Sequence, residues 1–359
     1  MERNDIIKKD LKYVSEQISD ISSKLEGKTI LLAGGAGFLG KYLVSTFDYL
    51  NENSLTNPCK VIVLDNLLSG LRENVSDNGN IKFIPQDISK KFQIDEKLDY
   101  IIHAASLASP IFYNKYKLET IDVGYLGTRN LLEIAKENSL ENYLHFSSSE
   151  IYGNPLPEFI PTKEDYLGNV SCNGPRSCYD ESKRVGEALT ATYKEVHNIP
   201  TTIVRPFNTY GPGMRLDDGR VIANFVVSAL KGEEISIYRG GTQTRTFCYI
   251  GDATAGYFKA LLYQGDDERV FNIGNDKPEV TMNRVAELVL ELVGNKDAKI
   301  NYIDKKEAMA IYHDKVDPDR RCPDLTRARK ILNYNPEITL EEGVKNFVDW
   351  AKGKLEKRL

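Results

Sequence analysis

The chain has 359 residues, 41% of them hydrophobic, which is enough for one large domain or for two modest domains that share an interface. Its net charge of -5, with both signs spread along the sequence, disfavours a nucleic acid or an anionic membrane as the main partner. No apolar run reaches the roughly 18 residues of a membrane-spanning helix, and the polar N-terminus lacks the apolar region of a signal peptide.

Residues 1–27 form the first predicted unit, an N-terminal helical extension. Their apolar side chains follow alternating steps of four and three, which is heptad spacing, but over fewer than three full heptads. Two arrangements are open: a helix that packs on its own domain, and a helix that pairs between subunits. The side chains in question are Ile7, Leu11, Val14, Ile18, Ile21 and Leu25.

From residue 28 onward, apolar strand patterns alternate with helical patterns. Helices are expected from about residue 38, over 118–137 and over 179–196. Such alternation predicts an α/β fold with a Rossmann-type, doubly wound parallel sheet. The predicted strands are residues 29–33, 61–64, 81–84, 100–105, 143–147 and 202–205.

After Pro206 the alternation changes, which predicts a smaller C-terminal α/β domain. We therefore predict one domain over 28–207 and a second domain over 208–359, partly interleaved with the first. The second domain is expected to contain helices 218–230, 252–263, 281–292, 325–332 and 340–352, and strands 235–238 and 246–250.

A glycine-rich loop joins the first predicted strand to a helix. Gly34, Gly37 and Gly40 allow a tight turn and close backbone approach to a pyrophosphate, whose charge sits on the helix N-terminus. Asp65 ends the second strand, where a carboxylate hydrogen-bonds a ribose diol and repels a 2'-phosphate. The pattern therefore predicts NAD rather than NADP.

Other residues near the strand ends complete the predicted cofactor site. Asp87 follows the third strand and fits either an adenine amine or a helix cap, and the sequence leaves both open. The predicted cofactor residues are Gly34, Gly37, Phe38, Leu39, Gly40, Asp65, Asn66, Ser69, Gly70, Asp87, Ile88, Ala104, Ser106, Tyr179, Lys183 and Thr209.

Tyr179 and Lys183 lie four residues apart, so they share one face of the predicted helix. A phenol titrates near ~10 unaided, and a cation on the next turn is expected to lower its pKa. A phenol with a lowered pKa is a usable base for a sugar hydroxyl. With the Ser147 to Ser149 hydroxyls and the dinucleotide loop, this pair predicts alcohol oxidation by a nicotinamide.

The combination resembles the extended short-chain dehydrogenase/reductase superfamily over essentially residues 28–355. The resemblance implies that Ser148 hydrogen-bonds the sugar hydroxyl and that Tyr179 is the base. It also implies that Lys183 lowers the pKa of Tyr179 and holds the nicotinamide ribose.

Within the superfamily, several local strings look like the UDP-glucuronate decarboxylases. This resemblance implies that Glu150 and Arg321 act around C5 and the carboxylate of the sugar, with Ser149 as a hydrogen-bonding partner. A hexuronic acid oxidised at C4 is a β-keto acid, which readily loses CO2. The strings are residues 148–153, 174–183, 207–212, 218–221, 243–245 and 317–324.

Residues of the second domain are expected to bind the rest of a UDP-sugar. Arg220 and Arg245 fit a diphosphate clamp, because guanidinium forks match phosphate oxygens, although solvated ion pairs are the alternative. Tyr238 fits a stacking partner for uracil or a core aromatic. The predicted substrate residues are Asn208, Arg220, Tyr238, Arg245 and Arg321. Glu150 and Arg321 also have alternatives: Glu150 as a structural carboxylate, and Arg321 as a phosphate-binding or surface ion-pair arginine.

Two departures from the decarboxylase pattern leave other functions open. Asp122 stands where that group commonly has a lysine, and Cys322 replaces its usual lysine after Arg321. A uronate 4-epimerase, a 4,6-dehydratase and a non-catalytic nucleotide sensor therefore remain alternatives. Dehydratases typically carry an acid at the position of Ser149, and simple epimerases lack one at Glu150.

The remaining expectations concern the setting of the protein. Five cysteines, odd in number and without CxxC spacing, indicate reduced thiols and a cytoplasmic location. Four scattered histidines make no metal-ligand pattern, so no metal is predicted. The family resemblance implies a homodimer formed through the helices near 118–137 and 179–196.

Overall fold

The core of the computed structural model, which describes residues 3–265, 268–294, 299–303 and 318–356, is a parallel sheet of seven strands. The strand order is β11-β6-β5-β4-β1-β2-β3, and every neighbouring pair is parallel. The predicted doubly wound α/β fold is therefore confirmed. The strands are β1 (Thr29–Ala33), β2 (Lys60–Asp65), β3 (Ile81–Pro85), β4 (Tyr100–His103), β5 (Asn142–Phe146), β6 (Thr201–Pro206) and β11 (Val270–Ile273).

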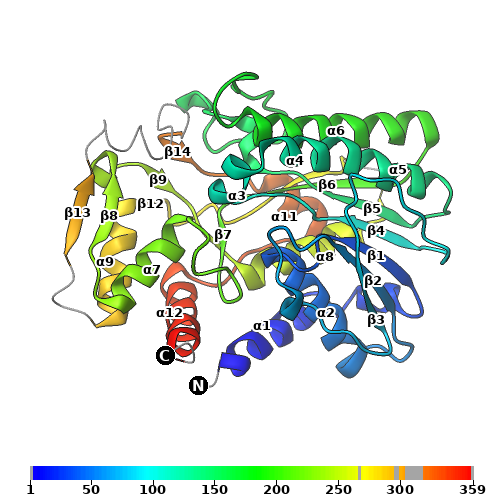
Figure 1. The fold of residues 1–359 in the computed structure, drawn as a ribbon, viewed down its shortest axis with the longest axis horizontal. Helices are drawn as coiled ribbons and strands as arrows, with labels where there is room; N and C mark the ends of the chain where they lie inside the picture. The colour runs from blue at the N-terminus through cyan, green and yellow to red at the C-terminus, as the bar shows by residue number, and fades with distance from the viewer. Residues whose placement is uncertain (1–2, 266–267, 295–298, 304–317, 357–359) are drawn as a thin grey trace.

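Helices cover both faces of this sheet, which explains why its central strands are continuous apolar runs. Leu31 and Leu32 point to opposite faces of β1, yet both are fully buried. Figure 1 shows α4, α5 and α6 on one side of the sheet and α1, α2 and α8 on the other. The bounds are α1 (Arg3–Gln17), α2 (Phe38–Asn53), α3 (Pro110–Lys115), α4 (Lys117–Asp122), α5 (Thr128–Lys136), α6 (Ser177–His197), α8 (Ile250–Leu261) and α11 (Thr326–Leu332).

The predicted helix over 118–137 consists of α4, the π-helical turn η3 (Val123–Gly127) and α5. At Gly124 in this turn, an added Cβ would lie 2.5 Å from the Cβ of Ser182 on α6. The glycine therefore lets the two helices approach closely, beside the segment of α6 that carries Tyr179 and Lys183.

Within its described residues, the C-terminal part contributes three small sheets and the helices α7, α9 and α12. Figure 1 shows β8, β13 and α9 on the left and α12 beside the C-terminus. The sheets are β12-β9-β14, β13-β8 and β10-β7. Their strands are β7 (Thr209–Tyr210), β8 (Ile235–Tyr238), β9 (Thr244–Arg245), β10 (Cys248–Tyr249), β12 (Val280–Thr281), β13 (Ile300–Ile303) and β14 (Arg320–Arg321), and the helices are α7 (Val221–Lys231), α9 (Met282–Val293) and α12 (Leu340–Glu356). Among the described residues, no helix has both the length and the apolar character needed to cross a bilayer.

Several predicted bounds in this part are wrong. The helix expected from residue 218 begins only at Val221, because Gly219 has φ +83° and Arg220 is extended. The strand expected over 246–250 is reduced to the two residues of β10, Cys248–Tyr249, and α8 already starts at Ile250. The first domain's strand over 100–105 also ends early, since β4 stops at His103 and the next residues leave the sheet.

The N-terminal helix α1 packs on its own chain, which is one of the two arrangements that the heptad pattern left open. Val14 and Ile18 are fully buried, and α1 contacts α2, α8 and α12. Asp10 is 3% exposed and accepts hydrogen bonds from the hydroxyls of Tyr42 (2.8 Å) and Tyr249 (3.0 Å). This carboxyl therefore ties α1 to α2 and β10.

Burial raises the pKa of Asp10 to about 7 from 3.8, so the stability that its protonation contributes is lost as pH rises through that range. We expect Asp10→Asn, which keeps a neutral acceptor, to abolish this loss, worth about 4 kcal/mol between about pH 4 and about pH 8. Urea unfolding of both proteins across that range measures it. Asp5→Asn on the same helix is the matched exposed control. Parallel pH curves for wild type and Asp10→Asn would contradict the assignment.

Candidate active site

The glycine loop between β1 and α2 is shaped for a close-lying ligand. Gly34 has φ +88°, and a Cβ at Gly40 would collide with the carbonyl oxygen of Gly34. The carboxylate of Asp65, at the end of β2, accepts the backbone N–H of Ala36 (3.0 Å) and of Leu67 (2.8 Å). Burial raises the pKa of Asp65, and these two hydrogen bonds oppose that effect. The carboxylate that is predicted to bind a ribose therefore also holds the glycine loop in place through these hydrogen bonds.

One large pocket extends from this loop into the C-terminal part. Nine predicted cofactor residues line it besides Tyr179 and Lys183, and they are Gly34, Gly37, Phe38, Leu39, Gly40, Ser69, Ala104, Ser106 and Thr209. The other five are not among its lining residues: Asp65, Asn66, Gly70, Asp87 and Ile88.

The predicted cofactor residues that do not line the pocket form turns or pack in the core. Asp87 accepts the N–H (3.0 Å) and hydroxyl (2.7 Å) of Ser89 in a turn. The structure describes every residue between β3 and β4 and has no helix there, so Asp87 is not the helix cap that the sequence left open. Asn66 accepts the N–H of Leu68, and Ile88 is 4% exposed in the apolar core. Their role toward a cofactor stays a prediction.

The structure brings the predicted catalytic residues together at the carboxyl end of β5. Ser148 caps the short helix η4 (Ser149–Tyr152) by accepting the N–H of Glu150. The Nζ of Lys183 donates to the carbonyl of Phe146 (2.7 Å) and lies 5.9 Å from the centre of the Tyr179 ring. Ser148, Tyr179 and Lys183 all line the large pocket.

The prediction that the pKa of Tyr179 is lowered is wrong for the protein chain alone. Burial raises it to about 12, and a hydrogen bond with Ser148 opposes that rise only in part. Burial also lowers the pKa of Lys183 to about 7, so this lysine is only partly charged near neutrality. Helical spacing predicted the contact but not the desolvation that outweighs it.

A charged cluster adjoins the catalytic residues. Glu150 and Arg321 form a two-pronged ion pair, with Oε1–Nη1 at 2.7 Å and Oε2–Nη2 at 2.9 Å. The Nη2 of Arg176 lies 2.5 Å from the same Oε2. All three side chains are at most 15% exposed and line the large pocket. Two guanidinium groups around one carboxylate leave this part of the pocket positively charged.

Asp180 is the fourth charged side chain of the cluster, and its Oδ1 lies 3.8 Å from the Nη2 of Arg176. Burial, followed by the charge of Glu150, raises the pKa of Asp180 well above its usual range. A carboxyl group with a raised pKa is less readily ionised, so Asp180 cancels only part of the positive charge of the cluster.

The sequence did not lead us to predict Arg176 as a site residue, although it lies within the string 174–183. Arg176 immediately precedes α6, and its tie to Glu150 joins residues 26 positions apart. The missed Tyr113 also lines the pocket, with its ring stacked on Tyr179 at 5.3 Å. The start of α3 at Pro110, after Ser109, was the available signal for the element that carries Tyr113.

The four remaining predicted substrate residues, Asn208, Arg220, Tyr238 and Arg245, also line the pocket. Arg220 forms a two-pronged pair with Asp218. Arg245 donates to the carbonyls of Pro318 (2.5 Å), Asp319 (3.1 Å) and Thr244 (2.8 Å). Both arginines therefore have protein partners, and their diphosphate role stays a prediction.

The two departures from the decarboxylase pattern lie away from the pocket. Asp122 is half-buried and Cys322 is 3% exposed, and neither is a lining residue. Asp122 therefore does not place its carboxylate among the residues that line the pocket. Asp317, which begins the last of the quoted strings, lies outside the described residues.

A family sequence model described as "NAD dependent epimerase/dehydratase family" matches residues 30–274. The chain belongs to this family. UDP-glucuronic acid decarboxylase 5 of Arabidopsis thaliana is 41% identical over 318 residues, which cover 88% of this chain and 86% of that protein. UDP-glucuronic acid decarboxylase 1 of Xenopus tropicalis is 34% identical over 337 residues, covering 93% and 74%. The family resemblance predicted from the sequence is therefore confirmed.

Solved structures agree with this assignment. An epimerase from Methanothermobacter thermautotrophicus superposes with a TM-score of 0.81 and 25% identity, covering 96% of this chain and 97% of that chain. UDP-glucuronic acid 4-epimerase from Bacillus cereus, in complex with UDP-glucuronic acid and NAD, has a TM-score of 0.74 and 26% identity, covering 90% and 99%.

Proposed function

We propose that the protein converts UDP-glucuronate to UDP-xylose with NAD as a resident cofactor. The observation that carries this proposal is the Glu150 carboxylate between Arg321 and Arg176, in the same pocket as Tyr179 and Lys183. The cluster of Glu150, Arg321 and Arg176 provides positive charge that can bind a uronate. Tyr179 and Lys183 provide the groups needed for alcohol oxidation. Identity of 41% to a decarboxylase over most of the chain supports the same reaction.

The residues around the glycine loop fit NAD. The absence of side chains at Gly34 and Gly40 leaves a close-packed turn before α2, whose N-terminus favours a pyrophosphate. Asp65 would hold the adenosine ribose, and Lys183 the nicotinamide ribose. When bound in its oxidised form, NAD supplies a hydride acceptor and a positive charge near the sugar. The other proposed cofactor residues are Gly37, Phe38, Leu39, Asn66, Ser69, Gly70, Asp87, Ile88, Ala104, Ser106, Tyr179 and Thr209.

The protein's own groups then move the protons and bind the developing charge. The Tyr179 oxygen takes the proton of the C4 hydroxyl, which Ser148 orients by a hydrogen bond. With C4 a ketone, the C5–C6 bond breaks, CO2 leaves, and the electron pair forms an enolate across C5, C4 and oxygen. Arg321 and Arg176 stabilise that negative charge, and a proton returns to C5 beside Glu150 and Ser149. The C4 carbon then takes back its hydride from the cofactor and the C4 oxygen takes back its proton from Tyr179, which gives UDP-xylose with no net change in the cofactor.

The UDP portion is assigned to the C-terminal part of the chain. We propose that Arg220 and Arg245 hold the diphosphate, with Asn208 and Tyr238 beside them. This assignment supports two domains: a cofactor domain that ends at residue 207 and a sugar domain that begins at residue 208. Residues 1–27 are proposed as an additional helical segment. Residues 250–273 return to the large sheet as α8 and β11, so the two parts are interleaved.

We also propose a homodimer formed through α4, η3 and α6. Leu118, Ile121 and Tyr125 are 75%, 43% and 38% exposed, and together they form an apolar strip on the α4–η3 segment. Val196 on α6 is 65% exposed. Pairing of two such surfaces would bury these side chains.

A cytoplasmic location is proposed on the cysteines. All five are free thiols, and four of them are buried. Reduced thiols are typical of proteins in the cytoplasm.

A product assay tests the proposed function. Incubation with UDP-glucuronate, followed by NMR, is expected to show UDP-xylose and released CO2. The second candidate is a uronate 4-epimerase, favoured by the likeness to the Bacillus cereus enzyme that binds UDP-glucuronic acid and NAD. UDP-galacturonate as the product would support that candidate and contradict decarboxylation.

A further inference from the structure

The three-stranded sheet β12-β9-β14 presents a different set of side chains on each of its two faces. In the register of β14 with β9, Arg321 lies beside Arg245 and Arg320 lies beside Thr244. Because side chains alternate along a strand, the first pair shares one face and the second pair shares the other.

The inner face belongs to the large pocket. Arg321 reaches Glu150 there, and Arg245 lines the same pocket. Arg245 also binds the carbonyls of Pro318 and Asp319, the two residues that lead into β14. The position of β14 therefore determines where the guanidinium of Arg321 lies.

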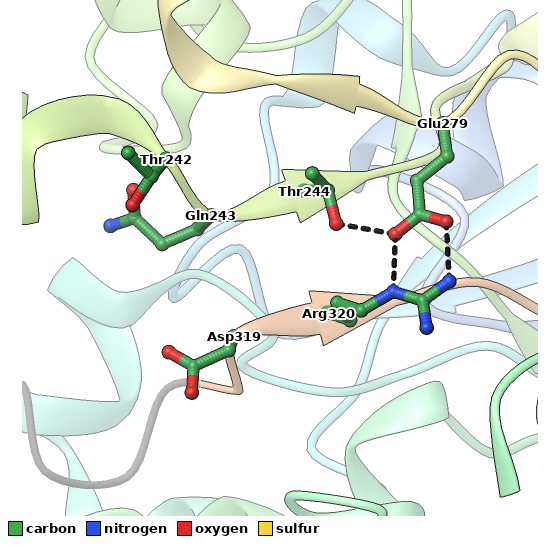
Figure 2. Close-up of a pocket in the computed structure, with 6 residues that line it drawn as sticks. All are labelled: Thr242, Gln243, Thr244, Glu279, Asp319 and Arg320. Carbon is green, nitrogen blue, oxygen red and sulfur yellow. Dashed lines mark hydrogen bonds and ion pairs between the residues drawn. The ribbon is translucent and has the colours of Figure 1, made fainter. Parts of the chain in front are cut away.

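The outer face carries an ion-paired clamp in a separate surface pocket, shown in Figure 2. Glu279, next to β12, accepts two hydrogen bonds from Arg320, from Nε at 2.9 Å and from Nη2 at 2.8 Å. The hydroxyl of Thr244 on β9 donates to the same carboxylate. One carboxylate thus joins all three strands.

Backbone hydrogen bonds also connect β14 to β9, among them Thr244 N–H to Asp319 carbonyl (3.0 Å) and Thr246 N–H to Arg321 carbonyl (3.2 Å). Two-residue strands have little intrinsic stability, so side-chain ties contribute a large share of the pairing.

We propose that Glu279, through Arg320 and Thr244, is a positioning residue that holds Arg321 against Glu150 in the catalytic pocket. This role rests on the proposed decarboxylation, because it acts on the arginine assigned to that step. It requires no contact of Glu279 or Arg320 with substrate or cofactor.

A charge exchange tests the proposal. Glu279→Arg and Arg320→Glu each place two like charges on the outer face and are expected to lower kcat about tenfold, since small displacements of a catalytic group are costly. KM, NAD affinity and the rate of cofactor reduction on mixing with substrate are expected to stay within about twofold. The double variant restores the ion pair and is expected to recover most of the lost kcat.

Arg284→Met is the matched control. Arg284 is also an exposed arginine paired with acidic residues, at 3.1 Å from Glu291, but on α9 and away from β14. Its activity is expected to equal that of wild type. If the wild type releases CO2 but the exchange variant is no better than the single variants, the positioning role is overturned. A wild type that releases no CO2 from UDP-glucuronate overturns the proposed function, and this role with it.

Discussion

Tyr179→Phe is expected to lower turnover of UDP-glucuronate by about 10²–10⁴-fold, because general-base catalysis contributes that much and only the phenol oxygen is lost. The ring remains, so its stacking on Tyr113 at 5.3 Å is retained and the pocket keeps its shape. Steady-state rates of CO2 release from the purified wild type and variant measure the effect.

The control for Tyr179→Phe is cofactor binding. The glycine loop and Lys183 are untouched, so NAD affinity by titration and thermal stability are expected to match wild type. Wild-type turnover in the variant would show that Tyr179 is not the base. A loss of NAD binding together with activity would show that the phenol acts in binding rather than in proton transfer.

Arg321→Met is expected to separate oxidation from decarboxylation. Removal of one group that stabilises a developing negative charge costs about 10²–10³-fold in rate. The Ser148, Tyr179 and Lys183 hydroxyl and amine groups remain in place, so C4 oxidation continues. Reduced nicotinamide, followed by its ultraviolet absorbance, is therefore expected to accumulate on mixing with UDP-glucuronate while CO2 release slows.

Glu150→Gln tests the same cluster from its centre. The amide keeps the shape but removes the charge that holds Arg321 and Arg176 together, so a similar loss of CO2 release is expected. Arg284→Met is the matched control, since this ion-paired arginine lies on α9, and its activity is expected to equal that of wild type. Equal effects on cofactor reduction and on CO2 release would contradict the assignment of Arg321 to the second step.

The large sheet was predictable because its strands carry local signals. Residues 29–33 form a short apolar run that leads into a glycine turn, and this run is β1. The strand β11 gave no comparable signal, since four residues after a helix acquire meaning only by pairing with β6, some 65 positions earlier. The two-residue strands β9, β12 and β14 exist only through tertiary contacts.

The candidate site was predictable where residues follow a strand or share a helix face. Tyr179 and Lys183 are one turn apart, and Ser148 follows β5, so local geometry already places all three. Arg176 was missed because its partner Glu150 comes from another element. The pKa of Tyr179 was predicted in the wrong direction, because burial is a property of the whole fold and cannot be read from the spacing of two residues.

The most direct test of the central claim follows the carboxyl carbon of the substrate. UDP-glucuronate isotopically labelled at C6 is incubated with the NAD-loaded protein, and labelled CO2 and labelled sugar nucleotide are measured together. The proposed mechanism predicts one labelled CO2 for each UDP-xylose formed, with no net consumption of NAD. Label that stays entirely in the sugar nucleotide, with the protein turning over, would contradict it.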